Sequence, residues 1–182
     1  MKTNKLILAG GCFWCTQADI KKLNGVISAI SGYIGGNKEN PTYEEICSQD
    51  KRLDGIKEAV EVTYNTDILT LKQILEYYFL HIDPTTENQQ FCDIGVQYQT
   101  AVFYNNLQEK NIINEFIDNL NNLNVLPDKV KTQVLPVSKF WPAEEYHQDF
   151  YLKNPVRYNN YKAGSGREVL AQIWKKYLAK KL

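Results

Sequence analysis

The stretch GGCFWC, residues 10–15, decides how this chain begins to fold. The residues before it, Leu6–Ala9, are apolar and predict a buried strand, whereas residues 16–23 have a composition that suits a helix. The two glycines would make the bend between them. We therefore expect Cys12 at or near a helix N-terminus, where exposed backbone N–H groups and the helix dipole favour a thiolate over a thiol.

The same six residues also allow a plainer interpretation. Glycines and aromatic rings are common in ordinary cores, and free cysteines are often buried and unreactive. The expected position of Cys12 at a helix start nevertheless favours a reactive thiol. Phe13 and Trp14 would place apolar rings beside its sulfur, which suits a substrate with a small apolar group next to an electrophilic atom.

The composition is that of an ordinary globular protein. The chain has 182 residues, of which 43% are hydrophobic and 23% are charged, which is enough for one domain with a substantial core. Lys and Arg together number 21, and so do Asp and Glu, so the net charge is zero. This balance gives no sign of a surface for nucleic acid or membrane, and we expect a monomer.

The N-terminus and the cysteines suggest a cytoplasmic location. Residues 1–9 hold two lysines and only four consecutive apolar residues, too few for the core of a signal peptide. No apolar run approaches the roughly 18 residues of a transmembrane helix. Four cysteines without a secretion signal favour a reducing compartment and redox, catalytic or metal roles over a disulfide scaffold.

The hydrophobic pattern predicts a strand–helix–strand order that occurs twice, as in a split βαβ unit. We therefore expect an α+β fold, a ferredoxin-like two-layer sandwich with extra helices and a coil-rich C-terminal region at 153–166. The expected strands are 6–9, 26–30, 59–64, 100–104 and 130–137. The expected helices are 12–23, 43–48, one that starts after Thr70, 107–123, 142–152 and 167–180. Polar loops are expected at 49–55 and 85–97, and the second is long enough to carry function.

Cys12 and Cys15 have the spacing Cys-x-x-Cys. Residues three apart lie on one face of a helix, so a disulfide between them is feasible. A zinc finger would need a second close pair, which Cys47 and Cys92 do not supply, so we expect no metal and no cofactor. A thioredoxin-like motif fits the strand–turn–helix setting but leaves the rest of the chain unexplained.

Several other polar side chains could take part in chemistry. Glu58 precedes an apolar strand, and a carboxyl desolvated there by aromatic neighbours would have a raised pKa and could donate a proton at neutral pH. An exposed surface glutamate is the plainer alternative. The remaining candidates are each as well explained by packing, turn capping or a structural role: Tyr33, Asp93, Tyr98 and His147.

Six separated motifs, in order, resemble the type A peptide methionine sulfoxide reductases over residues 5–165. The first motif is only moderately specific, but six in register are a strong signal. They are Gly11–Trp14, Gly32–Gly36, Pro41–Cys47, Glu58–Val62, Asp93–Tyr98 and Ala143–Gln148. The resemblance implies one catalytic domain over residues 1–182 that reduces the S epimer of methionine sulfoxide, in proteins and as the free amino acid.

The resemblance also implies a nucleophile and a reductant. Cys12 would attack the sulfoxide sulfur, while Phe13 and Trp14 hold the S-methyl group of the substrate. The product on Cys12 would be a sulfenic acid. A second thiol would condense with it to a disulfide, which thioredoxin would then reduce.

By the same resemblance, a group of polar side chains would bind the sulfoxide oxygen. Glu58, Tyr33 and Tyr98 would contact this oxygen, with Glu58 supplying the proton, and Asp93 would help to order the site. The chemistry fits these residue types, because the oxygen leaves only when it is protonated, so an acid must meet a thiolate at one sulfur.

The chain departs from part of this family in its cysteines. Many members carry recycling cysteines in a C-terminal tail, whereas this chain has none after Cys92. The usual glycine after Phe-Trp is Cys15 here, and Cys92 directly precedes Asp93. We predict that Cys15 is the resolving cysteine, with Cys92 as the alternative, and that Cys47 is buried and inert.

Two other functions stay open at this point. A general thiol–disulfide oxidoreductase would need Cys12 and Cys15 but not Glu58. A redox or metal-binding module without enzymatic activity would need none of the acid chemistry.

Overall fold

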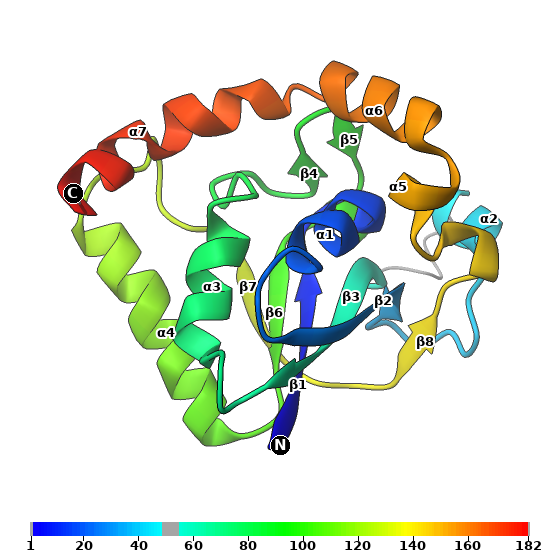
Figure 1. Ribbon diagram of the computed structural model, residues 1–182, viewed down its shortest axis with the longest axis horizontal. Coiled ribbons are helices and arrows are strands. Elements are labelled where there is room, and N and C mark those ends of the chain that lie inside the picture. The colour runs from blue at the N-terminus through cyan, green and yellow to red at the C-terminus, as the bar shows by residue number, and fades with distance from the viewer. Residues whose placement is uncertain (1, 49–54, 182) are drawn as a thin grey trace.

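A computed structural model describes residues 2–48 and 55–181, and these build a mixed sheet of six strands (Figure 1). The strands lie in the order β7-β6-β1-β3-β2-β8, and neighbours are antiparallel except for the parallel pair β6 and β7. They are β1 (Thr3–Ala9), β2 (Val26–Ile34), β3 (Lys57–Asn65), β6 (Ala101–Tyr104), β7 (Gln133–Pro136) and β8 (Phe140–Pro142). A small separate sheet pairs β4 (Gln89–Gln90) with β5 (Asp93–Ile94).

The helices gather on one side of the sheet and along one of its ends. Helix α1 packs on β2 and β3, α4 packs on α3, β6 and β7, and α5 to α7 form an arc beyond the tip of β1 (Figure 1). The α-helices are α1 (Phe13–Ile20), α2 (Tyr43–Cys47), α3 (Leu71–Phe79), α4 (Leu107–Asn122), α5 (Phe150–Lys153), α6 (Pro155–Gly164) and α7 (Leu170–Lys181). Short 3₁₀ turns are η2 (Val96–Tyr98), η3 (Glu145–His147) and η4 (Arg167–Val169).

The four central strands, β6-β1-β3-β2, are those of the two predicted strand–helix–strand units, and α1 and α3 are their helices. The mixed α/β architecture is thus confirmed. The sheet is larger than the predicted sandwich, because β7 and β8 extend it at its two edges.

Strand β8 replaces part of a predicted helix. The sequence predicts that Pro142 opens a helix, but Pro142 ends β8, where it pairs with Gly32 of β2. The glycine makes this pairing possible, because a Cβ there would lie 2.3 Å from the carbonyl oxygen of Trp141 and 2.4 Å from the ring of Phe140. Strand β2 itself runs to Ile34, four residues beyond the predicted strand at 26–30.

Strand β1 is buried on both faces, as its unbroken apolar run predicts. Leu6 and Leu8 belong to the main core beneath the helices, and Ile7 and Ala9 belong to a second cluster on the opposite face. The other buried members of that second cluster are Ile34, Ala59, Ala101 and Phe103.

Helix α3 begins and buries its apolar face as predicted. The hydroxyl of Thr70 accepts a hydrogen bond from the backbone of Gln73, and the Gln73 side chain accepts one from the backbone of Thr70. This reciprocal cap satisfies two donors at the helix start. The side chains that α3 buries are Ile74, Leu75, Tyr78 and Phe79.

The C-terminal region contains more helix than the sequence predicts. Residues 153–166 were expected as coil, but α6 occupies 155–164, with Pro155 in its first turn where its missing N–H costs nothing. The predicted helix at 142–152 is instead the end of β8, η3 and the short α5. Helix α7 is anchored by Trp174, which is 2% exposed and donates a hydrogen bond to the carbonyl of Ile82.

Two further expectations concern the ends and loops of the chain. The predicted polar loop at 49–55 lies outside the described residues except for Gly55. Among the helices that the structure describes, none is long and apolar enough to span a membrane.

Gly32 and Gly164 offer a matched test of the β8 edge. Gly32→Ala should lower the free energy of unfolding by about 2 kcal/mol or more, because the new methyl group would displace β8. Gly164→Ala places the same methyl group where nothing lies within 4 Å. This control should be neutral or stabilising by about 0.5–1 kcal/mol, since alanine favours a helix over glycine. Denaturant unfolding of both variants is the measurement, and equal stabilities would contradict the account of Gly32.

Candidate active site

Cys12 caps the N-terminus of α1, as the sequence predicts. Its backbone carbonyl accepts hydrogen bonds from the N–H groups of Cys15 and Thr16, both at 3.2 Å. Gly11, directly before it, has a φ of +77°, and a Cβ there would lie 2.5 Å from the side chain of Gln90. Glycine is thus required in the turn that leads from β1 to the start of α1.

Glu58 lies on β3 and is only 2% exposed, so it is not a surface glutamate. Its Oε2 accepts a hydrogen bond of 3.0 Å from the backbone N–H of Phe13, the residue after Cys12. Burial raises the pKa of Glu58 to about 8; the Phe13 N–H opposes this rise, and the charge of Asp93 adds to it. At neutral pH this carboxyl is therefore mostly protonated and sits beside the start of α1.

Cys12 and Cys15 form a buried thiol pair. Burial raises the pKa of Cys12 well above its usual value, and its hydrogen bond to Cys15 and the charge of Glu58 act in the same direction. The hydrogen bond from Cys12 lowers the pKa of Cys15 to about 7 against burial, with help from the charge of Arg167 and a hydrogen bond from Tyr158. The expectation of a lowered pKa at Cys12 is therefore wrong for the free protein, because burial outweighs the helix end.

The charge of Glu58 acts on three tyrosines, namely Tyr33, Tyr43 and Tyr98. The hydroxyl of Tyr33 donates to Glu144 Oε2 at 2.9 Å, so its proton is already engaged. Burial raises the pKa values of Tyr43 and Tyr98, and in both cases the charge of Glu58 is the next cause. The charge of Glu58 thus acts on Tyr98, a predicted site residue, and on Tyr43.

Tyr43 was not among the predicted site residues. It is the first residue of α2, directly after the Thr42 cap, and its backbone N–H donates to Glu144 at 2.9 Å. Its ring stacks on Phe13 with a centroid distance of 6.3 Å and contacts His147 at 4.4 Å. The signal for it was its place in the Pro-Thr-Tyr motif, where a helix start fixes the direction of the side chain.

Asp93 connects the small β4–β5 sheet to the C-terminal region. Its Oδ2 accepts a short hydrogen bond from the hydroxyl of Tyr161 on α6. The same hydroxyl also lies near Cys12, where it opposes the rise in the thiol pKa. Tyr161 lies in the stretch expected as coil, so the sequence carried no signal for it.

The ring of Trp14 is fixed from three sides. Its Nε1 donates to Nδ1 of His147 at 2.9 Å, and its plane stacks on Phe150 at a centroid distance of 3.8 Å. Tyr161 meets it edge-on at 5.9 Å. Phe13 is almost fully buried and packs its ring against His147 as well. His147 therefore orients the aromatic wall, which agrees with its expected structural role.

The sequence profile of the family described as peptide methionine sulfoxide reductase matches residues 4–178 of this chain. The chain belongs to this family. It is 43% identical over 167 residues to MsrA of Bacillus licheniformis, covering 91% of both chains. It is 45% identical over 161 residues to MsrA/MsrB of Vibrio cholerae, covering 88% of this chain but only 42% of that longer relative.

Solved structures of the family share the fold. Reduced Mxr1 of Saccharomyces cerevisiae is 29% identical, with a TM-score of 0.78 over 85% of this chain and 87% of that one. A further structure, Mxr1 in complex with Trx2, is 21% identical, with a TM-score of 0.56 over 82% of this chain and 85% of that one.

This member of the family has two buried and two exposed cysteines. Cys12 and Cys15 are buried side by side at the start of α1. Cys92 is exposed, with its Sγ 3.8 Å from Oδ1 of Asp93. Cys47 was expected to be buried, but it ends the short α2 and is exposed. Within the described ranges there is no group of three or more His, Cys, Asp or Glu side chains that could hold a metal ion.

The raised pKa of Glu58 predicts a specific pH dependence of stability. Between its usual value of 4.5 and its folded value of about 8, the folded protein holds a proton that the unfolded chain has lost. Its contribution to stability is therefore full at pH 4 and falls as the pH rises through this window, by roughly 1 kcal/mol per pH unit.

Glu58→Gln lacks this titration. The free energy of unfolding of the unmodified protein, relative to Glu58→Gln, should therefore fall steadily from pH 5 to pH 8. Denaturant unfolding at several pH values measures this difference, and a constant difference would show that Glu58 is ionised at neutral pH.

Proposed function

We propose that this protein is a peptide-methionine (S)-S-oxide reductase in which Cys12 attacks the sulfoxide sulfur of the substrate. The family membership supports the activity. The single observation that carries the mechanism is the hydrogen bond between the buried Glu58 carboxyl and the amide of Phe13, because it holds an acid beside the attacking sulfur. Methionine sulfoxide in oxidised proteins and the free amino acid are both proposed substrates.

The first chemical step needs a proton on the leaving oxygen and electrons from sulfur. Cys12 attacks the sulfoxide sulfur, and Glu58 protonates its oxygen. The products are methionine, which is reduced by two electrons, and a sulfenic acid on Cys12, which is oxidised by two. The raised pKa of Glu58 keeps a proton available for the sulfoxide oxygen at neutral pH. It also keeps the carboxyl mostly neutral, so that Glu58 does not repel the thiolate that forms on Cys12.

Tyr43 and Tyr98 are the proposed hydrogen-bond donors to the sulfoxide oxygen, together with Glu58. Tyr33 is proposed to share this role, and its hydroxyl, which donates to Glu144 in this structure, would donate to the sulfoxide oxygen when substrate binds. Glu144 also accepts a hydrogen bond from the backbone N–H of Tyr43 and so fixes the start of α2. Asp93 is proposed to order the site by holding Tyr161.

Trp14 and Phe13 are proposed to hold the S-methyl group of the substrate. Trp14 is held rigidly by His147 and Phe150, so it can offer a fixed apolar surface without an entropic cost of ordering on binding. Phe13 follows Cys12 directly, and its ring lies between the nucleophile and the core.

Cys15 is the proposed resolving cysteine. It lies beside Cys12 and its lowered pKa favours the thiolate that would attack the sulfenic acid. The proposed reductant of the resulting disulfide is thioredoxin, which is in keeping with the complex of Mxr1 with Trx2. Cys92 is the alternative resolving cysteine, since it is exposed and adjacent to Asp93.

Three broader features complete the proposal. The four central strands, which pair with one another in antiparallel fashion, support the ferredoxin-like split βαβ description for the core of the sheet. We propose that residues 1–182 form one catalytic domain that acts as a monomer. The proposed location is the cytoplasm, where thioredoxin and reduced thiols are available.

Glu58→Gln separates this function from general thiol–disulfide exchange. Reduction of the S epimer in a thioredoxin-coupled assay should fall by roughly 10²–10⁴-fold, because glutamine cannot supply the proton. Disulfide exchange with a small disulfide should change little, since it needs only the two cysteines. The separated R epimer is the substrate control. Little change in either assay would favour the oxidoreductase alternative, which does not need Glu58.

Peptide mapping after one turnover without reductant identifies the resolving cysteine. We expect a disulfide between Cys12 and Cys15, because the two sulfurs already contact each other. A link between Cys12 and Cys92, or a sulfenic acid that persists on Cys12, would rule out Cys15. The Cys15→Ser variant is the matched control and should accumulate the sulfenic acid.

A further inference from the structure

Arg167 is a buried cation with unused hydrogen-bond donors. It lies in η4, between α6 and α7, and is only 8% exposed. Its Nε and Nη2 atoms have no hydrogen-bond partner in the part of the chain that the structure describes. Its guanidinium lies 4.6 Å from the centroid of the Phe91 ring, which offsets only part of the cost of burial. A buried arginine with unpaired donors destabilises the fold unless an anion lies nearby to balance its charge.

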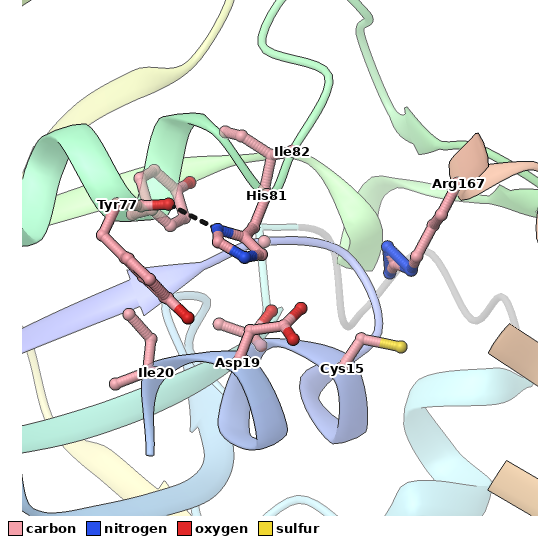
Figure 2. Close-up of a pocket in the computed structure, with 10 residues that line it drawn as sticks. Cys15, Asp19, Ile20, Tyr77, His81, Ile82 and Arg167 are labelled. Carbon is pink, nitrogen blue, oxygen red and sulfur yellow. Dashed lines mark hydrogen bonds between the residues drawn. The ribbon is translucent and has the colours of Figure 1, made fainter. Parts of the chain in front are cut away.

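The pocket that Arg167 lines points to that anion. Figure 2 shows the guanidinium directed toward the side of the pocket from which Cys15 projects, and both residues line this pocket. Asp19, on the same wall, already accepts hydrogen bonds from Lys22 at 2.9 Å and Lys162 at 3.3 Å. Asp93, whose charge also acts on Arg167 from outside this pocket lining, already accepts a hydrogen bond from Tyr161. Within the pocket lining, the sulfur of Cys15 is thus the group that can balance the arginine.

We infer that Arg167 is a positioning residue that holds the sulfur of Cys15 as a thiolate, ready to attack Cys12 after it has been oxidised. The inference rests on the proposed role of Cys15 as the resolving cysteine. It gives the C-terminal segment, which carries no cysteine, a part in recycling the enzyme.

The electrostatic effects on the two groups agree with this placement. After the hydrogen bond from Cys12, the charge of Arg167 is the largest influence that lowers the pKa of Cys15. Burial alone would lower the pKa of Arg167, but nearby charges, that of Cys15 foremost, hold it above its usual value. Each group therefore favours the charged form of the other.

The step that Arg167 assists can be written in full. The Cys15 thiolate attacks Sγ of the Cys12 sulfenic acid, so that an S–S bond forms and the S–O bond breaks. The oxygen leaves as water after taking a proton from solvent. Cys15 is oxidised and Cys12 is reduced, each by one electron. The rate depends on the fraction of Cys15 that is ionised, so loss of the arginine should slow this step at neutral pH.

Other titratable groups also act on Cys15 and enter the design of the test. Tyr77 of α3 and His81, which follows that helix, line the same pocket as Cys15. The groups that influence Cys15 electrostatically are Cys12, Asp19, Lys22, Glu58, Tyr158 and Arg167. The test therefore changes Arg167 alone and leaves these groups in place.

The first measurement follows ionisation of Cys15 directly. In a background of C12S, C47S and C92S, Cys15 is the single thiol, and the hydroxyl at position 12 can still donate to it. The ultraviolet absorbance of the thiolate is titrated with pH for this protein and for the same protein with Arg167→Met. We expect the midpoint to rise by about one pH unit or more, a tenfold fall in the thiolate fraction below the midpoint.

Two further variants separate charge from structure. Arg167→Lys should restore most of the shift, because it keeps a cation in the pocket. Lys175→Met removes a cation from an exposed position on α7 and should leave the midpoint unchanged. Circular dichroism shows whether each variant is folded, and if Arg167→Met is not, Arg167→Gln, which also lacks the charge, takes its place. A midpoint in the charge-free variant equal to that of the parent would overturn the inference, and so would a midpoint in Arg167→Lys as high as that of the charge-free variant.

The second measurement uses the protein with all its cysteines in a single turnover with methionine sulfoxide. Arg167→Met should release methionine at close to the normal rate but form the disulfide about tenfold more slowly at pH 7, with recovery at higher pH. An unchanged pH profile of disulfide formation would contradict the role of Arg167. If Cys15→Ser still forms an intramolecular disulfide, the proposed resolving role of Cys15 fails instead, and the titration still decides the placement of Arg167.

Discussion

The backbone N–H of Phe13 donates a hydrogen bond to the buried carboxyl of Glu58, and this contact joins the start of α1 to β3. It requires Cys12 to cap the helix and Gly11 to turn sharply before it. The contact also requires Glu58 to stay out of water, which raises its pKa to about 8. The proposed reaction needs a protonated acid, Glu58, and an ionised thiol, Cys12. The contact fixes these two residues beside each other in the fold.

The C-terminal segment completes the site from the opposite side. Tyr161 on α6 connects Asp93 to Cys12, and Arg167 in η4 lies beside Cys15. Burial of the thiol pair under this segment explains why Cys12 keeps its proton in the free protein, despite its place at a helix end.

Sequence patterns predicted the parts of this arrangement that local rules govern. The helix start at Cys12 follows from two glycines after an apolar strand. For Glu58 the sequence left a buried and an exposed position open, and the place of β3 between β1 and β2 decides for burial. The sequence did not predict strand β8, because this strand has only three residues and forms by pairing with β2 around Gly32, which is distant in the sequence. The low accessibility of Cys12 likewise depends on segments that meet only in the folded chain, so no local pattern could reveal it.

Infrared spectroscopy of the carboxyl groups tests the central claim most directly. A protonated carboxyl has a carbonyl band that a carboxylate lacks, and comparison with Glu58→Gln assigns the band to this residue. The account predicts that the Glu58 band is present at pH 7, falls to half its intensity around pH 8 and is lost above that. A Glu58 that is already ionised at pH 6 would contradict the account, because no acid would then be available beside Cys12.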